Sequence, residues 1–180
     1  PICGPKGAAH VFAPQKGASP DQVVMLDNQL CLWSALLKQH TGKDVTRLKH
    51  GGAAGGITAA MHAFLNAQLI SGSEYCLTLS HFHDNLLQAG IVITGEGKID
   101  IQSFYGKIPG TVATLCLQQN VPVYAVVGLA EKQVLTRFDK VFTMSQYARS
   151  IQDSIKNAPY YLKIIAQAIV DTLYSSAYSD

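Results

Sequence analysis

Residues 94–109 carry the side chains of this chain that are best suited to chemistry, in the order TGEGKIDIQSFYGKIP. The stretch has two ammonium groups, Lys98 and Lys107, and two carboxylates, Glu96 and Asp100. Ammonium groups neutralise phosphoryl or carboxylate oxygens, whereas carboxylates orient hydroxyl groups or hold divalent cations. This combination favours a site that binds a phosphoryl group or a small organic acid.

Glycines and short polar side chains in the same stretch also suit an anionic ligand. A glycine lets backbone N–H groups approach a phosphate, and a helix N-terminus adds partial positive charge. A simpler interpretation is a capped turn between a strand and a helix, with Asp100 as the cap and Lys107 solvated. The residues expected to contact substrate or phosphate are Gly95, Gly97, Gln102, Ser103 and Gly106.

Two common phosphate-binding motifs are absent from this stretch. A Walker A loop needs Ser or Thr after Gly-Lys, and neither Gly97-Lys98 nor Gly106-Lys107 is followed by one. A dinucleotide fingerprint needs a third glycine, where Asp100 stands. An oxidoreductase half-domain that binds a dinucleotide is therefore the weaker alternative.

The elements around this stretch are typical of an α/β fold. An apolar strand leads into it, and strands and helices then alternate to the end of the chain, which predicts a parallel, doubly wound sheet. Three strands make half of a Rossmann or flavodoxin-like sheet. The predicted strands are 91–94, 122–127 and 140–144, and the predicted helices are 109–119, 130–137 and 151–174.

The first part of the chain has a less regular pattern. Residues 1–20 are loop-like, and Ser19-Pro20 with Gln22 predicts a capped helix that runs to about His40. The expected elements after it are a helix from the glycine-rich residues 51–56 to Leu69, a strand at 74–79 and a short helix at 82–89. We expect residues 1–85 to be part of a smaller mixed α/β domain and 86–180 to be the C-terminal part of the Rossmann-like domain.

Composition excludes some functions. The 180 residues are 48% hydrophobic and 14% charged, with a net charge of +2 and no run of Lys or Arg, so nucleic-acid and membrane binding gain no support. No apolar window is long enough to span a membrane, and no signal peptide is visible. Four cysteines without a CxxC pair predict buried, reduced thiols and a cytoplasmic location.

A few other residues are assigned to structure rather than chemistry. Trp33 is expected in the core, and the tyrosines of the last helix are expected to pack it against the protein. His81 and His83, with Asp84, are spaced like metal ligands but are expected to be solvated or capping. The tyrosines are Tyr160, Tyr161, Tyr174 and Tyr178.

The pattern from Gly95 to Pro109 closely resembles the signature of bacterial glycerate kinases. Lys98 stands where arginine is commoner, so the charge is kept but a bidentate fork is lost. A departure occurs at residues 50–52, His-Gly-Gly, where the family usually has Gly-Ala-Gly. Other segments that resemble the family, in the same order, are 4–9, 12–18, 52–56 and 122–128.

The resemblance implies phosphorylation of D-glycerate by ATP, with Mg²⁺ as cofactor, to give 2- or 3-phosphoglycerate. It implies catalytic roles for Glu96, Lys98, Asp100 and Lys107, with Glu96 and Asp100 as candidate metal ligands. Small residues and lysines elsewhere are candidates for binding substrate or phosphate, although the small residues also suit close helix packing. These are Gly52, Gly55, Gly56, Lys6 and Lys16.

Members of the resembled family are about twice as long as this chain. Their N-terminal half completes the Rossmann-like domain and contributes to the site, and it has no counterpart here. We therefore expect a C-terminal portion of a glycerate kinase that requires the missing half. The alternative is a truncated remnant that folds but has no turnover.

Overall fold

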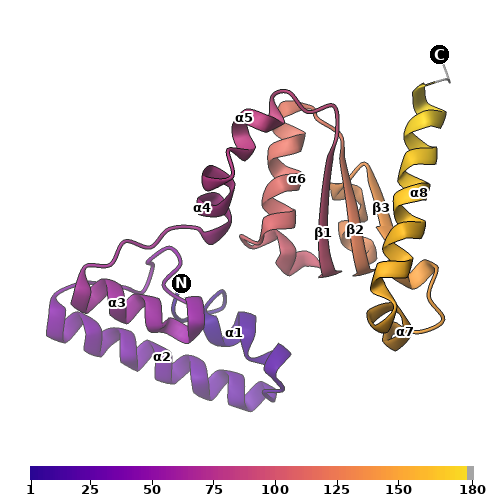
Figure 1. Ribbon diagram of the computed structural model, residues 1–180. Coiled ribbons are helices and arrows are strands. Elements are labelled where there is room, and N and C mark those ends of the chain that lie inside the picture. Colours follow the sequence, from indigo (N-terminus) through magenta and orange to yellow (C-terminus); the bar gives the residue numbers. More distant parts are fainter. Residues whose placement is uncertain (178–180) are drawn as a thin grey trace. The chain divides into compact units, whose positions relative to one another are not determined.

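The computed structural model describes residues 1–177, and the chain divides into two compact units (Figure 1). The first unit runs from Pro1 to Ser71 and the second begins at Gly72. The predicted domain boundary lies between residues 85 and 86, whereas both short helices from Gly72 to Leu86 belong to the unit that contains the sheet.

The first unit is helical. Its core is a cluster of buried aliphatic side chains that includes Ile2, Leu37 and Val45. Residues 1–20 are not entirely loop, since they contain α1 and a 3-10 turn. The helices are α1 (Ala8–Phe12), α2 (Pro20–Thr41) and α3 (Ile57–Leu65), and the 3-10 turns are Pro14–Lys16 and Ala53–Gly56.

Helix α2 confirms the prediction made from its capping residues. The backbone N–H of Gln22 donates to Ser19 Oγ at 3.3 Å, and the N–H of Ser19 donates to Gln22 Oε1 at 2.8 Å. Pro20 occupies the first turn, where its missing N–H costs nothing. Gly42 ends the helix with φ of 74°.

Helix α3 is shorter than predicted, because it ends before Asn66 rather than at Leu69. Asn66 adopts a left-handed conformation with φ of 54°, which stops the helix. The ammonium of Lys43 then donates to the carbonyls of His62 and Ala63 at 3.2 and 2.9 Å. These bonds satisfy carbonyls that have no partner further along the helix.

The second unit confirms the α/β class, with a parallel sheet in the order β1-β2-β3. The strands are β1 (Val92–Ile99), β2 (Val123–Ala130) and β3 (Lys140–Thr143). The helices are α4 (Gly72–Leu79), α5 (Phe82–Leu86), α6 (Ile108–Gln119), α7 (Ile151–Lys156) and α8 (Ala158–Ala177), and the 3-10 turns are 101–104, 132–137 and 144–146.

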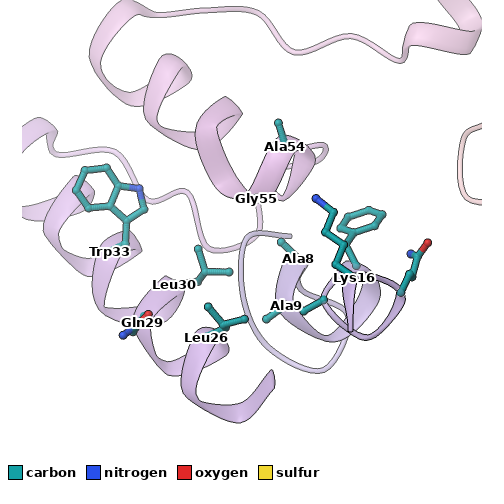
Figure 2. A pocket seen from close by; sticks show the side chains of 12 residues that line it. Ala8, Ala9, Lys16, Leu26, Gln29, Leu30, Trp33, Ala54 and Gly55 are labelled. Atoms are coloured by element: carbon teal, nitrogen blue, oxygen red, sulfur yellow. The ribbon is translucent and has the colours of Figure 1, made fainter. Parts of the chain in front are cut away.

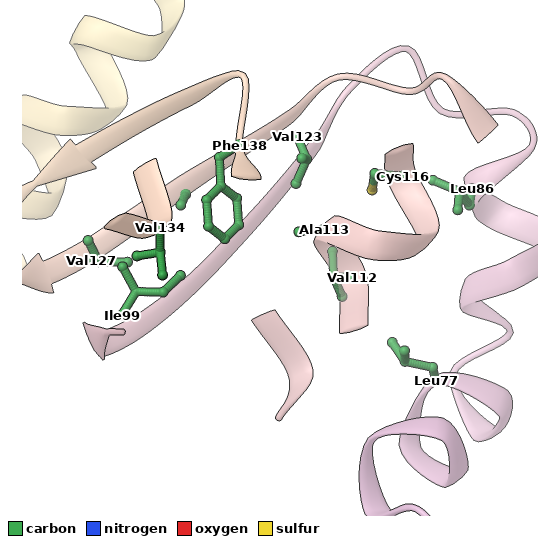
Figure 3. Close-up of a cluster of buried hydrophobic side chains, with 11 residues drawn as sticks. Leu77, Leu86, Ile99, Val112, Ala113, Cys116, Val123, Val127, Val134 and Phe138 are labelled. Atoms are coloured by element: carbon green, nitrogen blue, oxygen red, sulfur yellow. The ribbon is translucent and has the colours of Figure 1, made fainter. Parts of the chain in front are cut away.

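Helices cover both faces of this sheet (Figure 1). Successive residues of a strand point to opposite faces. Val123 and Val127 of β2 therefore join a cluster with α6, as Figure 3 shows, whereas Tyr124 packs against Ile165 and Ile169 of α8. The sheet is the rigid layer that positions the residues at its carboxyl edge.

The strand expected at residues 74–79 is wrong, because this segment forms α4. Its buried positions are Ser73 and Leu77, which are four residues apart as on one face of a helix. The weak alternation of apolar residues was a poor guide, since α4 buries only one narrow stripe.

Strand β1 is longer than predicted and continues through residues 95–99. The glycines here allow the strands to approach closely. A Cβ on Gly95 would lie 2.8 Å from the carbonyl oxygen of Val126, and one on Gly128 would overlap that of Gly97. The first six residues of the stretch at 94–109, which was expected to be a loop, are therefore strand.

The last predicted helix is two helices, α7 and α8, separated at Asn157. Pro159 has no N–H to donate to the carbonyl of Ile155, so one continuous helix would lose a hydrogen bond there. The helix predicted at 130–137 is confirmed in part: Ala130 belongs to β2, and the helix at Lys132–Arg137 is a 3-10 helix.

Some side chains differ from the prediction in their burial. Trp33 is 40% exposed instead of lying in the core. All four cysteines are free thiols, but only Cys116 is buried, and Cys31 and Cys76 are exposed. Burial raises the pKa of the Cys116 thiol.

The tyrosines of the last helix also differ from one another. Tyr161 is buried as predicted, whereas Tyr160 and Tyr174 are 62% exposed. Tyr178 lies outside the described residues. Within residues 1–177, none of the helices has the length and apolar character needed to cross a membrane.

Candidate active site

Glu96 of β1 is the centre of a cluster at the carboxyl edge of the sheet. Its Oε2 accepts a hydrogen bond from Ser103 Oγ at 2.7 Å, and its Oε1 lies 3.2 Å from Lys107 Nζ. Ser103 is fully buried and the Glu96 side chain is 23% exposed, whereas the Lys107 side chain is 49% exposed. The structure thus joins three residues that the sequence analysis selected.

Asp100 is the N-cap of the 3-10 turn that follows β1. Its Oδ1 accepts from the N–H of Gln102 at 2.9 Å, and its own N–H donates to Ser103 Oγ at 3.3 Å. The capping role that the sequence analysis left open is therefore present. Its other oxygen, Oδ2, lies 3.4 Å from Lys98 Nζ, so the same carboxylate also faces an ammonium group.

Glu131 is a member of the site that the sequence analysis missed. Lys98 Nζ donates to Glu131 Oε1 at 2.8 Å, across the ends of β1 and β2. The position of Glu131 was the available signal, because it directly follows the second strand and parallel strands end at one edge of a sheet. The hydrogen bond to Glu131 raises the pKa of Lys98, and the same bond lowers the pKa of Glu131.

We expect Glu131→Gln to change the pH dependence of unfolding. A lowered carboxyl pKa adds stability above the ordinary glutamate pKa, and this stability is lost as the pH falls through the depressed value. The raised pKa of Lys98 adds stability that is lost only at alkaline pH. Urea unfolding should show a small deficit for the variant near neutral pH, and a smaller one in acid below the ordinary glutamate pKa. An equal deficit at both pH values would contradict the ion pair as its cause.

Two glycines of the stretch face open space. A Cβ on Gly97 would meet no atom within 4 Å, and the same holds for Gly106, whose φ of 91° makes the turn before α6. Space beside a backbone is what close approach of a ligand requires. Gly95 is different, because its missing Cβ is explained by packing against Val126.

The predicted binding residues of the first unit do not all lie together. Lys16 and Gly55 line one cavity of about 550 Å³. Gly52 and Gly56 are buried, and a Cβ there would overlap the carbonyl of Pro1 or press on Ile2, so packing accounts for both. Lys6 is exposed and does not line this cavity.

A metal site built from protein ligands alone is not found among residues 1–177, where no three His, Cys, Asp or Glu side chains are grouped to hold an ion. His81 is exposed and lies 3.6 Å from Asp84, in line with the expected solvated role. The oxygens of Glu96 and Asp100 already have protein partners. A cation here would need further oxygens from a ligand such as a nucleotide.

The model of the glycerate kinase family matches residues 1–174 of this sequence. The chain belongs to the glycerate kinase family. The glycerate kinase of Halalkalibacterium halodurans is 45% identical over 128 residues, which are 71% of this chain and 34% of that protein. The glycerate 2-kinase of Escherichia coli K12 is 41% identical over the same shares of both chains.

Longer alignments to the family cover almost all of this chain. The glycerate kinase of Haemophilus influenzae is 34% identical over 177 residues, which are 96% of this chain and 47% of the relative. The crystal structure of a protein assigned as glycerate kinase 2 from Salmonella typhimurium LT2 superposes with a TM-score of 0.64 at 37% identity, covering 98% of this chain and 46% of that one. The chain therefore spans less than half the length of these relatives.

Proposed function

We propose that this chain is the C-terminal portion of a glycerate kinase that transfers the γ-phosphoryl group of ATP to a hydroxyl of D-glycerate. Family membership over residues 1–174 supports the proposal. The observation that carries it is the contact of Glu96 with both Ser103 and Lys107 at the carboxyl edge of a parallel sheet, where α/β folds bind ligands.

Glu96 fixes Lys107 without using up its ammonium. A lysine has three N–H donors, and Glu96 takes one, so the half-exposed Lys107 keeps donors for phosphoryl or carboxylate oxygens. Lys98 is held in the same way by Glu131 and Asp100. Positioned charges of this kind stabilise a phosphoryl group in transfer, because it carries negative charge on its oxygens.

Helix α6 begins beside this cluster, with Lys107 as its N-cap residue. Its first-turn N–H groups have no partners within the helix and carry partial positive charge. Gly106 makes the turn that leads into α6. We place the oxygens of the transferred group, or of the glycerate carboxylate, beside this turn and the Lys107 ammonium.

The carboxylates complete the proposed mechanism. The glycerate oxygen forms a bond to the γ-phosphorus while the bond from that phosphorus to the bridging oxygen breaks and ADP leaves; the hydroxyl proton passes to Glu96 or Asp100. A Mg²⁺ ion would supply charge neutralisation for the phosphoryl oxygens of the nucleotide. Where Glu96 takes the proton, Asp100 would be the protein ligand of this ion, since the Oδ2 contact with Lys98 is the longest in the cluster.

We also propose that residues from Gly72 onward form the C-terminal part of a Rossmann-like domain, and that residues 1–71 are part of the smaller domain. Strand β1 is at one edge of the three-stranded sheet, next to β2 only. The relatives are about twice as long as the aligned region. The missing half would supply the neighbouring strands.

An assay of ADP release tests the function. The chain is incubated with Mg-ATP and D-glycerate, alone and mixed with the N-terminal half of a family member, and the same mixture without D-glycerate is the control. Activity that appears only in the complete mixture supports a two-part enzyme. No activity in any mixture, although both parts are folded by circular dichroism, would favour the inactive remnant.

A further inference from the structure

The first unit contains a cavity that the cluster around Glu96 does not use. It has a volume of about 550 Å³ and lies among α1, α2 and the 3-10 turn Ala53–Gly56 (Figure 2). Aliphatic side chains such as Leu26 and Leu30 line it, together with two aromatic rings. The rings, Phe12 and Trp33, are 44% and 40% exposed, so they are open to a ligand.

The polar side chains of the cavity are few: the ammonium of Lys16 and the amides of Gln15 and Gln29, of which Gln15 donates to the carbonyl of Val11. The ammonium of Lys16 has no hydrogen bond or ion pair with any described residue, and the same holds for the side-chain amide of Gln29. In Figure 2, Lys16 lies across the cavity from Trp33. No acidic side chain is among the described residues that line the cavity. These features select a ligand with an apolar body and a negatively charged group.

Part of the backbone that lines the cavity is held in an uncommon conformation. Ala54, Gly55 and Gly56 have φ of 50°, 72° and 96°, three left-handed residues in succession. Alanine is strained in this region, and strain of this kind concentrates at ligand sites. Gly55 has open space where a Cβ would be, so a ligand can approach its backbone.

The size of the cavity distinguishes between the two substrates of a glycerate kinase. Small-molecule sites measure about 300–1,000 Å³ and are mostly apolar, with a few polar groups that fix the orientation of the ligand. D-glycerate, a three-carbon acid with two hydroxyls, is too small and too polar for these walls. An adenine nucleotide has a flat base to stack on the rings and phosphates to meet the ammonium.

We propose that this cavity binds the base and ribose of an adenine nucleotide, with Lys16 contacting a phosphate group. The proposal rests on the proposed function, since it gives the nucleotide of that reaction a place in the first unit.

Trp33 provides a direct test, because it is the only tryptophan of the chain. The whole chain is titrated with ADP, adenosine, tripolyphosphate and D-glycerate, and tryptophan emission is excited at the red edge, where adenine does not absorb. We expect a saturable change with ADP, a similar amplitude but weaker binding with adenosine, and none with the other two compounds.

Variants separate the phosphate contact from the base contact. Lys16→Ala should weaken the binding of ADP about tenfold, which corresponds to about 1.4 kcal/mol. The binding of adenosine should be unchanged. Lys49→Ala is the matched control, since Lys49 is an exposed lysine of the same unit that does not line the cavity.

Two results would overturn the proposal. One is that ADP causes no saturable change in Trp33 emission. The other is that the N-terminal half of a relative changes this emission while ADP does not. Different results would contradict the proposed kinase function and the proposed nucleotide site. ADP binding at Trp33 with no turnover in the reconstituted mixture would defeat the kinase reaction alone. Turnover whose KM for ATP is unaffected by Lys16→Ala, with no Trp33 response, would defeat this site alone.

Discussion

Replacing Lys107 with alanine should lower the rate of D-glycerate-dependent ADP release by the reconstituted enzyme by a factor of about 10²–10³. Loss of one preorganised charged contact to a transferring group has an effect of this size. The folded chain should change little, because the Lys107 side chain is half exposed and Glu96, the partner of its ammonium within residues 1–177, keeps the hydrogen bond from Ser103. Steady-state rates and the thermal midpoint Tm check the two parts of this prediction.

The matched control for Lys107 is Lys163→Ala, an exposed lysine on α8 for which no partner is seen among the described residues. It should keep both the rate and the Tm of the parent chain. If Lys107→Ala also kept the parent rate, our assignment of its ammonium to phosphoryl or carboxylate oxygens would be wrong, whatever the activity of the mixture.

Replacing Gly128 with alanine should destabilise the chain by about 1–3 kcal/mol or more, the range for forcing atoms into a packed interior. The new Cβ would overlap the carbonyl oxygen of Gly97 on the neighbouring strand. A backbone atom in a paired strand cannot move aside as a flexible side chain can, so β1 and β2 must separate locally. Urea unfolding gives the free energy, and Tm should fall by about 2–4 °C for each kcal/mol.

Gly97→Ala is the matched control, because its Cβ would meet nothing within 4 Å on the same pair of strands. Its stability should stay within about 0.5 kcal/mol of the parent. Equal destabilisation by the two alanines would show that close approach of the strands is not the cause. A stable Gly97→Ala that is slow in the reconstituted assay would further support ligand approach at this backbone.

Local signals in the sequence predicted the elements that have them. Helix α2 has a capping box at Ser19 and a glycine after Thr41, so both ends were predicted well. The parallel sheet was predicted from the regular alternation of strands and helices along the second half of the chain. The hydrophobic pattern was misleading in two places, because tertiary contacts decide the conformation there. Helix α4 buries only one narrow stripe of residues, and Gly95 lies inside a strand where it closely approaches the neighbouring strand.

The candidate site shows the same division. The residues of one continuous stretch, such as Glu96, Ser103 and Lys107, were selected from sequence and do contact one another. Glu131 was missed because its ion pair with Lys98 depends on the register of two strands, which sequence spacing does not express. The sequence left two roles open for Gly52, ligand binding and close packing, and its close approach to Pro1 could not be read from local spacing.

The parallel pairing of β1, β2 and β3 has a consequence for how the chain acquires its structure. The pairs β1–β2 and β2–β3 are parallel, so a crossover segment rather than a hairpin connects each pair. Each pair therefore joins residues that are distant in the sequence, and such pairings form slowly. Helix α2 is capped at both ends by neighbouring residues, so it can form without distant pairings. During synthesis on the ribosome we expect the first unit to become compact early, while the second exposes apolar strands for longer and depends more on chaperones.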